Sequence, residues 1–187
     1  MKKSSFWSDA SRCGAIVGVV NAVVSLLGMV LPSMAFVFSV VNFAATIYLL
    51  FYFARKRANL FIEDGFTYAQ SLGFIVGSAL FAGVVCAVYQ ILASNFLFTE
   101  QMEQTLATTI AELQKTGVYQ GDMIKQMASM MRSYMFSPIA ILWSQVLGNA
   151  LYLGFLGLFI SVGTKREPVL FTLDEPEEQS DENEEQE

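Results

Sequence analysis

The sequence predicts an all-α integral membrane protein, a bundle of four transmembrane helices with an extracytoplasmic helical hairpin between the third and the fourth. The 187-residue chain is 54% hydrophobic, and its mean hydropathy is +0.47. Four apolar runs have about the 20 residues that a helix needs to cross a bilayer. None of these runs contains Asp, Glu, Lys, Arg or His between its ends.

The four runs divide the chain into one membrane domain, 13–163, with a cytoplasmic N-terminus, 1–12, before it and a disordered acidic tail, 164–187, after it. The predicted spans cover 13–31, 34–54, 68–98 and 135–162, and the predicted hairpin covers 99–134.

The first two helices form an antiparallel pair because only Leu31-Pro32-Ser33 separates them, and proline suits the first turn of a helix. Residues 1–35 also resemble a signal peptide, with Lys2 and Lys3 before an apolar stretch. That stretch is longer than the roughly 7 to 15 residues of a signal sequence. We therefore expect an uncleaved first helix.

Basic residues predict the orientation of the bundle. They flank the expected spans at the N-terminus, at 55–57 and at 165–166, whereas the long connection between the third and fourth spans carries only three. The positive-inside rule then places both termini in the cytoplasm. The net charge of -6 comes from the tail, because nine of the seventeen acids lie in 174–187. We expect this tail to be solvated, with docking to a basic partner as the alternative.

The connection between the third and fourth spans predicts two amphipathic helices. Apolar residues recur every three or four positions from Met102 to Leu113, and again from Met123 to Tyr134. Gly117 and Gly121 mark the turn between them. The two apolar stripes either pack on each other as a projecting hairpin or lie flat on the membrane surface.

Small residues at helical spacing predict close helix packing within the bundle, because they let backbones approach each other in lipid. The same faces also fit packing between copies of the chain, so a homo-oligomer stays open. The candidate packing residues are Gly14, Gly18, Gly73, Gly77, Gly148, Gly154 and Gly157.

Several polar residues of the expected spans are amides. Gln145 and Asn149 are four residues apart and therefore share a helix face. An amide inside the bilayer is expected to hydrogen-bond to another helix, or to line a polar groove for a lipid headgroup or small solute. The candidate intramembrane polar residues are Asn21, Asn42, Gln90, Gln145 and Asn149.

The predicted hairpin is rich in methionine, and we expect its methionine face to be a packing or partner surface. Methionine at this spacing forms a deformable apolar face, and the candidate partner residues are Met123, Met127, Met130 and Met131. Thioether clusters can also bind Cu(I), a rival hypothesis that adds Met102 and Met135. The two cysteines, Cys13 and Cys86, suit neither a disulfide nor a metal site.

Nothing in the sequence predicts catalysis. The chain has no histidine, no phosphate-binding glycine loop and no ionisable residue inside a span. We expect no enzyme activity, no cofactor, no catalytic or metal-ligating residue and no nucleic-acid partner. The bilayer itself is the expected partner, with another envelope membrane protein as a further candidate.

The stretch Phe66-Thr67-Tyr68-Ala69-Gln70-Ser71-Leu72-Gly73-Phe74 resembles the start of the third helix in a family of small bacterial membrane proteins known only as a domain of unknown function. The resemblance covers most of 8–163 and implies a four-helix protein of the bacterial inner membrane. It implies no catalytic residues.

These observations favour a non-enzymatic accessory or scaffold protein of the bacterial envelope, located in the inner membrane. The first alternative is a membrane partner in lipid-linked sugar or lipid handling, with the amides as the lipid contact. The second is a metal-handling protein that uses the hairpin methionines.

Overall fold

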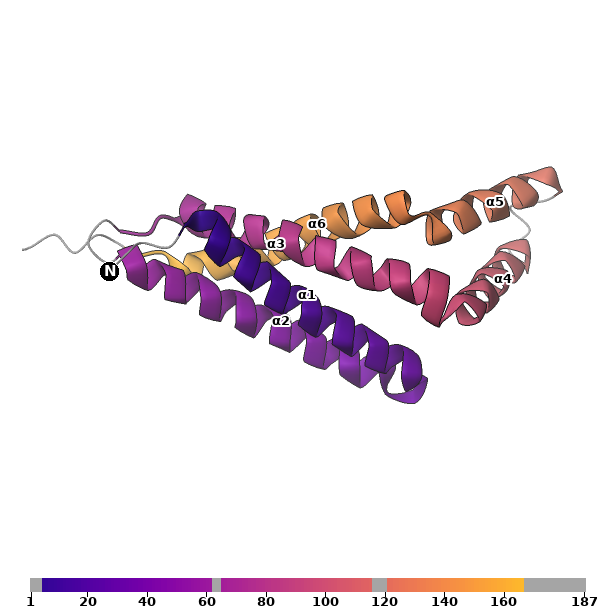
Figure 1. The fold of residues 1–187 in the computed structure, drawn as a ribbon, viewed down its shortest axis with the longest axis horizontal. Coiled ribbons are helices and arrows are strands. Elements are labelled where there is room, and N and C mark those ends of the chain that lie inside the picture. Colours follow the sequence, from indigo (N-terminus) through magenta and orange to yellow (C-terminus); the bar gives the residue numbers. More distant parts are fainter. Residues whose placement is uncertain (1–4, 62–64, 116–120, 167–187) are drawn as a thin grey trace, which may run out of the picture.

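The computed structural model describes residues 5–61, 65–115 and 121–166, and the described chain is almost wholly helical (Figure 1). The helices are α1 Phe6–Val30, the short 3-10 helix η1 Pro32–Met34, α2 Ala35–Ala58, the 3-10 helix η2 Asn59–Phe61, α3 Tyr68–Leu92, the π-helical turn η3 Ala93–Leu97, α4 Thr99–Lys115, α5 Asp122–Phe136 and α6 Pro138–Thr164. The predicted tail lies outside the described residues from position 167 onward.

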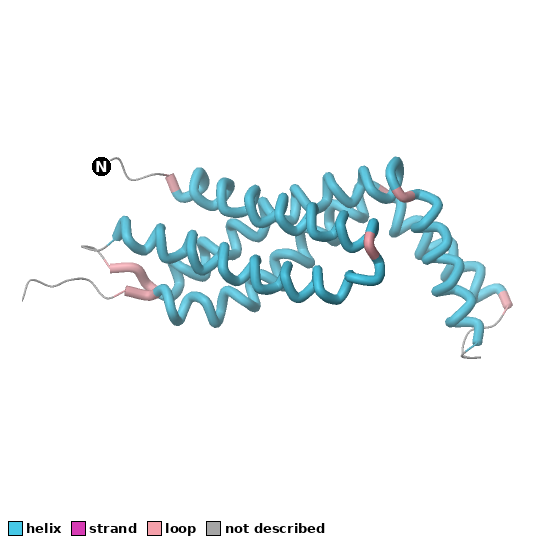
Figure 2. Tube along the Cα trace, turned by 90° about the horizontal axis from the view of Figure 1, so that it is seen from below, coloured by secondary structure: helices cyan, strands magenta, loops and turns pink. Residues whose placement is uncertain are grey.

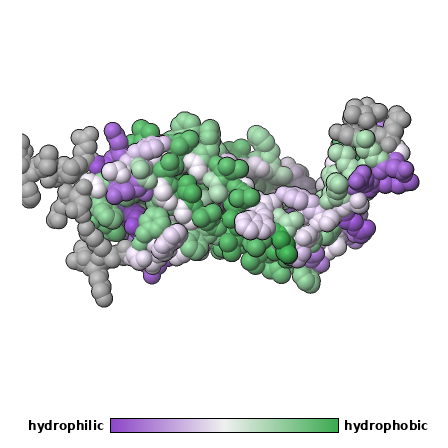
Figure 3. Space-filling view, turned by 90° about the horizontal axis from the view of Figure 1, so that it is seen from above, coloured by the Kyte–Doolittle hydropathy of each residue, from purple (hydrophilic) through white to green (hydrophobic). Residues whose placement is uncertain are grey.

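Four helical segments are long and apolar enough to cross a membrane, in agreement with the four predicted spans. They are Phe6–Val30, Pro32–Phe61, Tyr68–Leu97 and Pro138–Thr164. Apolar side chains cover the middle of the molecule, and hydrophilic ones gather toward its two ends (Figure 3). Two boundaries differ from the prediction: α1 begins seven residues earlier than expected, and a break at Ser137 assigns Met135 to α5.

Local chemistry explains where the helices begin. Thr67 caps α3: its hydroxyl accepts from Gln70 N at 3.2 Å, and its own backbone N–H donates to Gln70 Oε1 at 2.9 Å. Ser137 caps α6 by accepting from Ala140 N at 3.4 Å, and Pro138 occupies the first helical position. The break before α6 therefore follows from a serine and a proline placed side by side.

The well-packed core lies at one end of the bundle. We call this the basic end, because Arg12, the 55–57 cluster, Lys165 and Arg166 gather there. The buried residues of α1 lie between Ala10 and Gly18, whereas those of α2 lie between Thr46 and Ala58. A two-way backbone bridge between Phe66 and Arg166, with both N···O distances 2.8 Å, joins the start of α3 to the end of α6.

Away from the basic end, α1 and α2 diverge from α3 and α6 (Figure 1). α3 is the central helix: it packs most extensively on α6 and α1, whereas α2 and α3 touch little. The separation leaves the far halves of α1 and α2 covered mainly by each other.

α4 and α5 lie beyond the far end of α3 and α6 and bend away from the bundle axis (Figure 2). Leu106 of α4 is buried, and Arg132 of α5 forms an ion pair with Glu103 of α4 at 2.5 Å. Both helices were predicted from their apolar periodicity. The π-helical turn before α4 was not predicted; there, Asn95 Nδ2 donates to the backbone oxygen of Ile91 at 3.1 Å.

Candidate intramembrane polar site

All five predicted intramembrane amides line one cavity, although they come from four different helices. Asn21 lies on α1, Asn42 on α2, Gln90 on α3, and Gln145 and Asn149 on α6. The cavity has a volume of about 210 Å³, and we call it the amide cavity. It lies where α1 and α2 begin to separate from α3 and α6, just beyond the buried core.

Close backbone contacts on both sides of α3 hold the helices around this cavity. A Cβ at Gly18 would lie 2.7 Å from Val85 Cβ, and one at Gly83 would lie 2.7 Å from Val146 Cα. Real Cβ atoms do not approach other atoms so closely, so α1 and α6 rest against α3 because these positions carry no side chain. Gly83 was missed in the sequence, where no GxxxG partner points to it.

The other predicted glycines fall into two groups. A Cβ at Gly14, Gly77 or Gly157 would meet a neighbouring helix at 3.3 Å or less, and one at Gly154 would make an ordinary contact of 3.7 Å with Val76. Gly73 and Gly148 differ from the packing expectation: a Cβ at either position would meet no described atom within 4 Å. Their faces of α3 and α6 are exposed, so these two glycines bring no helix backbones together.

Hydrogen bonds fix three of the amides. Thr46 Oγ1 of α2 donates to Asn21 Oδ1 of α1 at 3.1 Å. Asn149 Nδ2 donates to the backbone oxygen of Gln145 at 2.8 Å and approaches its Oε1 at 3.4 Å. The predicted pair on α6 therefore bonds within its own helix, whereas Asn21 is fastened across to α2 by a threonine that the sequence did not single out.

Asn42 stands apart from the other amides. Its Oδ1 atom is buried and has no hydrogen-bond partner among the described residues. Leaving such a group unpaired costs roughly 1 to 3 kcal/mol, and within a bilayer no bulk water satisfies it. One residue that lines the amide cavity, Asn42, therefore carries a buried acceptor with unused hydrogen-bonding capacity.

Polar and aromatic side chains that the sequence did not single out complete the lining. Tyr89 and Tyr152 contribute from α3 and α6, and Ser25 and Cys86 from α1 and α3. A tyrosine presents an apolar ring with one hydroxyl, which suits a mixed polar and apolar ligand. The signal in the sequence was spacing: Tyr89 is adjacent to Gln90, and Tyr152 lies three residues after Asn149.

Two further hollows share lining residues with the amide cavity. Ser25 and Asn42 also line a hollow of about 280 Å³ between α1 and α2. Gln90 and Gln145 also line one of about 200 Å³ that reaches Met102 and Tyr134 of α4 and α5. Each is smaller than the roughly 300 to 1,000 Å³ typical of small-molecule sites. The three hollows adjoin one another at these shared residues.

The amide cavity is lined mainly by neutral polar and aromatic side chains. Amides are neutral donors and acceptors that do not titrate in the physiological range, and the Tyr152 hydroxyl adds a donor. The Tyr89 hydroxyl already donates to Met29 Sδ at 3.8 Å. No group of three or more His, Cys, Asp or Glu that could hold a metal ion occurs in the part of the chain that the structure describes.

The predicted methionine surface lies elsewhere, on α5. Met123 and Met130 are 58% and 61% exposed, whereas Met127 and Met131 are half-buried. These four residues therefore do not form one exposed face.

Four apolar helices around a neutral polar cavity define a multi-pass helical membrane protein. The chain belongs to the family described as "Protein of unknown function (DUF4199)", whose model matches residues 12–166. This match confirms the resemblance to a family of unknown function that the stretch 66–74 indicated. No curated protein and no solved structure matches the chain.

Proposed function

We propose that this protein is a non-enzymatic membrane protein that binds a lipid with an uncharged, hydrogen-bonding group, and that the amide cavity holds that group. The observation that carries the proposal is the convergence of five amides from four helices on one cavity. One of them, Asn42, has a buried Oδ1 without a hydrogen-bond partner among the described residues. Amides scattered only to fasten helices would pair with each other and leave no such acceptor.

The neutral lining favours a particular ligand chemistry. Among the described residues, no lysine or arginine lines the amide cavity, and the sequence has no histidine. A phosphate placed there would therefore lose its hydration without gaining a counter-charge. Hydroxyls of a sugar or glycerol group, or an ester or amide linkage, match side chains that both donate and accept. This chemistry supports a role beside proteins that handle lipid-linked sugars or other lipids.

We further propose that the basic end faces the cytoplasm and that the host membrane is the bacterial inner membrane. The bases at 55–57 and 165–166 support this orientation through the positive-inside rule. The amide cavity then lies deeper toward the outer leaflet, on the side of the bundle where α1 and α2 diverge from α3 and α6.

The test compares co-purified lipids. Wild-type protein and the double variant Gln145→Leu/Asn149→Leu are purified in mild detergent, and bound lipids are identified by mass spectrometry. The matched control is Gln101→Leu/Gln126→Leu, which replaces two exposed amides outside the cavity. We expect one lipid class enriched over the bulk membrane in the wild type and in the control, and reduced at least tenfold in the cavity variant. An unchanged lipid profile in the cavity variant, with normal helicity, would contradict the proposal.

An accessory role in an envelope complex is the second candidate function, favoured by the exposed apolar side chains of α5. Met123 and Met130 are exposed on an amphipathic helix that makes few contacts with the bundle. Crosslinking with mass spectrometry on native membranes tests this role through Lys115 and Lys125. Reproducible links to one other membrane protein support it, whereas self-links alone, at good coverage, count against it.

A further inference from the structure

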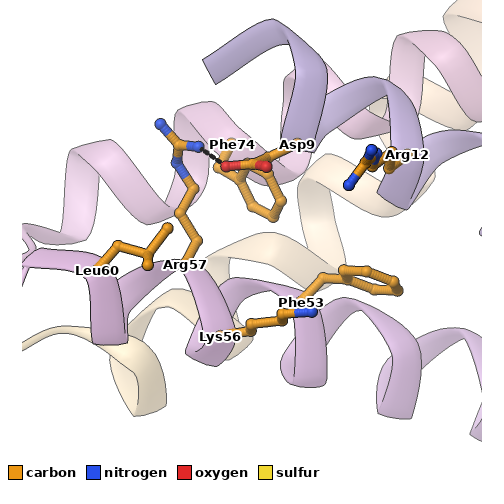
Figure 4. Close-up of a pocket in the computed structure, with 7 residues that line it drawn as sticks. All are labelled: Asp9, Arg12, Phe53, Lys56, Arg57, Leu60 and Phe74. Atoms are coloured by element: carbon orange, nitrogen blue, oxygen red, sulfur yellow. Dashed lines mark hydrogen bonds and ion pairs between the residues drawn. The ribbon is translucent and has the colours of Figure 1, made fainter. Parts of the chain in front are cut away.

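A second polar hollow lies at the basic end of the bundle, remote from the amide cavity. It has a volume of about 240 Å³ and lies between the start of α1 and the end of α2, with Phe74 of α3 behind it (Figure 4). The proposed function does not use this hollow, and the lining residues of the two sites do not overlap.

Arg57 forms a fixed wall of this hollow. It is only 7% exposed and forms an ion pair with Asp9. Its guanidinium also lies over three aromatic rings, 5.1 Å from the centroid of Phe6, 5.5 Å from that of Phe74 and 5.6 Å from that of Phe61. Cation–π contacts and the carboxylate together hold this charge in place.

Arg12 and Lys56 differ from Arg57 because no carboxylate of the described residues forms an ion pair with them. Both side chains line the hollow, Arg12 from α1 and Lys56 from α2, on either side of the gap between the helices (Figure 4). Both residues are exposed, and neither forms an ion pair within the described residues. With three cations and one carboxylate, the lining carries a net charge of +2.

We propose that this hollow binds a phosphate group. Arginine offers a planar set of donors that matches phosphate, and lysine adds a second positive charge. The volume of about 240 Å³ admits a phosphate and its immediate substituents but falls below the range of larger ligands. Phe53 and Leu60 give the hollow an apolar side, which suits the start of a lipid acyl chain.

The phosphate can belong to an anionic lipid or to a free anion, because both present the same oxygens to Arg12 and Lys56. Basic pockets between transmembrane helices are known to hold anionic headgroups. The positive-inside bias by itself also places bases at this end, so the test has to separate a pocket from general surface charge.

The experiment measures thermal unfolding of the full-length protein in a neutral detergent. The probes are inorganic phosphate, compared with chloride at equal ionic strength, and phosphatidylglycerol in mixed micelles, compared with phosphatidylcholine. A ligand that binds the folded state raises the unfolding midpoint. The variant is Arg12→Gln/Lys56→Gln, and the matched control is Lys165→Gln/Arg166→Gln, which removes two exposed bases from the same end.

We expect one of the probes to raise the midpoint in the wild type and in the control, and we expect the pocket variant to bind that probe about tenfold more weakly or worse. A rise with phosphatidylglycerol but not with inorganic phosphate identifies a lipid headgroup, and a rise with inorganic phosphate identifies a free anion. No rise with either probe overturns the proposal. An equal loss in both double variants also overturns it, because general charge then explains the effect. Because Arg12 and Lys56 are exposed, the pocket variant is expected to fold, which its midpoint without probes checks.

Discussion

Thr46 and Asn21 join α2 to α1 through a hydrogen bond of 3.1 Å, with Thr46 as the donor and 1% exposed. It connects the buried core at the basic end to the amide cavity, because Asn21 lines that cavity while Thr46 belongs to the core side of α2. The bond also orients the Asn21 amide, since its Oδ1 is engaged and its Nδ2 donors remain for the cavity.

Replacing Thr46 by Val is therefore expected to destabilise the bundle modestly. Interhelical hydrogen bonds in membranes contribute about 0.6 to 1.7 kcal/mol, and the substitution keeps the shape of the side chain. The measurement is reversible unfolding in mixed detergent. The control is Thr108→Val in α4, whose exposed hydroxyl bonds only within its own helix, to the backbone oxygen of Gln104 at 2.9 Å. Equal effects of the two substitutions would show that the bond between helices adds nothing.

Gly14 and Gly28 lie on the same helix in opposite surroundings, and their alanine variants should differ. A Cβ at Gly14 would collide with the backbone oxygen of Ser78 and lie 2.6 Å from Phe81 Cβ, whereas one at Gly28 would meet nothing within 4 Å. Gly14→Ala forces α1 away from α3 and should cost about 1 to 3 kcal/mol. Gly28→Ala should be neutral or slightly stabilising, because alanine favours helix.

Unfolding midpoints of the two glycine variants, measured side by side in one detergent, check this prediction. A Gly14→Ala variant as stable as Gly28→Ala would mean that α1 and α3 do not approach as closely as the structure has them.

Asp9→Asn should lower the free energy of unfolding far more than Glu103→Gln, which breaks an exposed ion pair. The substitution leaves the Arg57 guanidinium, 7% exposed, without its carboxylate. Breaking a buried pair on one side costs about 3 to 5 kcal/mol. Contact with three aromatic rings and the partial exposure of Asp9 place the expected loss at the low end of that range. Glu103→Gln breaks the exposed pair with Arg132 and should cost less than about 1 kcal/mol.

A companion variant tests the reason for the loss. Asp9→Asn/Arg57→Met removes both charges, and it should recover much of the stability lost in Asp9→Asn, because no uncompensated buried cation remains. Thermal unfolding of the single and double variants gives the comparison. A double variant less stable than Asp9→Asn would assign the effect to lost packing around Arg57 instead.

The spans could be predicted from the sequence because hydropathy over about 20 residues is a local property. The presence of amides within the spans could be predicted for the same reason. Their convergence could not, because it depends on how each helix is rotated about its axis, and close approaches at Gly18 and Gly83 set that rotation. Gly83 has no glycine four residues away to mark it, and the alanines at that spacing, Ala79 and Ala87, were not singled out.

The Asp9–Arg57 pair was missed for a different reason. From the sequence, Arg57 was interpreted as one of several bases that fix the orientation in the membrane. Asp9 was assigned to a cytoplasmic segment before the first helix. Because α1 begins at Phe6, Asp9 lies within a helix and at the same level as Arg57. Pairing between positions that are 48 residues apart is visible only once both helices are positioned.

Replacing two buried serines near the basic end by alanine should change the free energy of unfolding differently. Ser71 Oγ lies 2.6 Å from Thr164 Oγ1, and Thr164 already donates to the backbone oxygen of Ile160 at 3.1 Å. Ser71 is therefore the donor of the α3–α6 bond, and Ser71→Ala should cost about 0.5 to 1.5 kcal/mol.

Ser161 Oγ is buried and has no partner among the described residues. Ser161→Ala removes a desolvated hydroxyl without breaking a bond, so the free energy of unfolding should stay constant or rise. Both variants lose one hydroxyl from a fully buried side chain, which makes each the control for the other. Detergent unfolding of the two proteins checks the sign. If Ser161→Ala lowers stability as much as Ser71→Ala does, the Ser161 hydroxyl has a hydrogen-bond partner in the membrane-embedded protein.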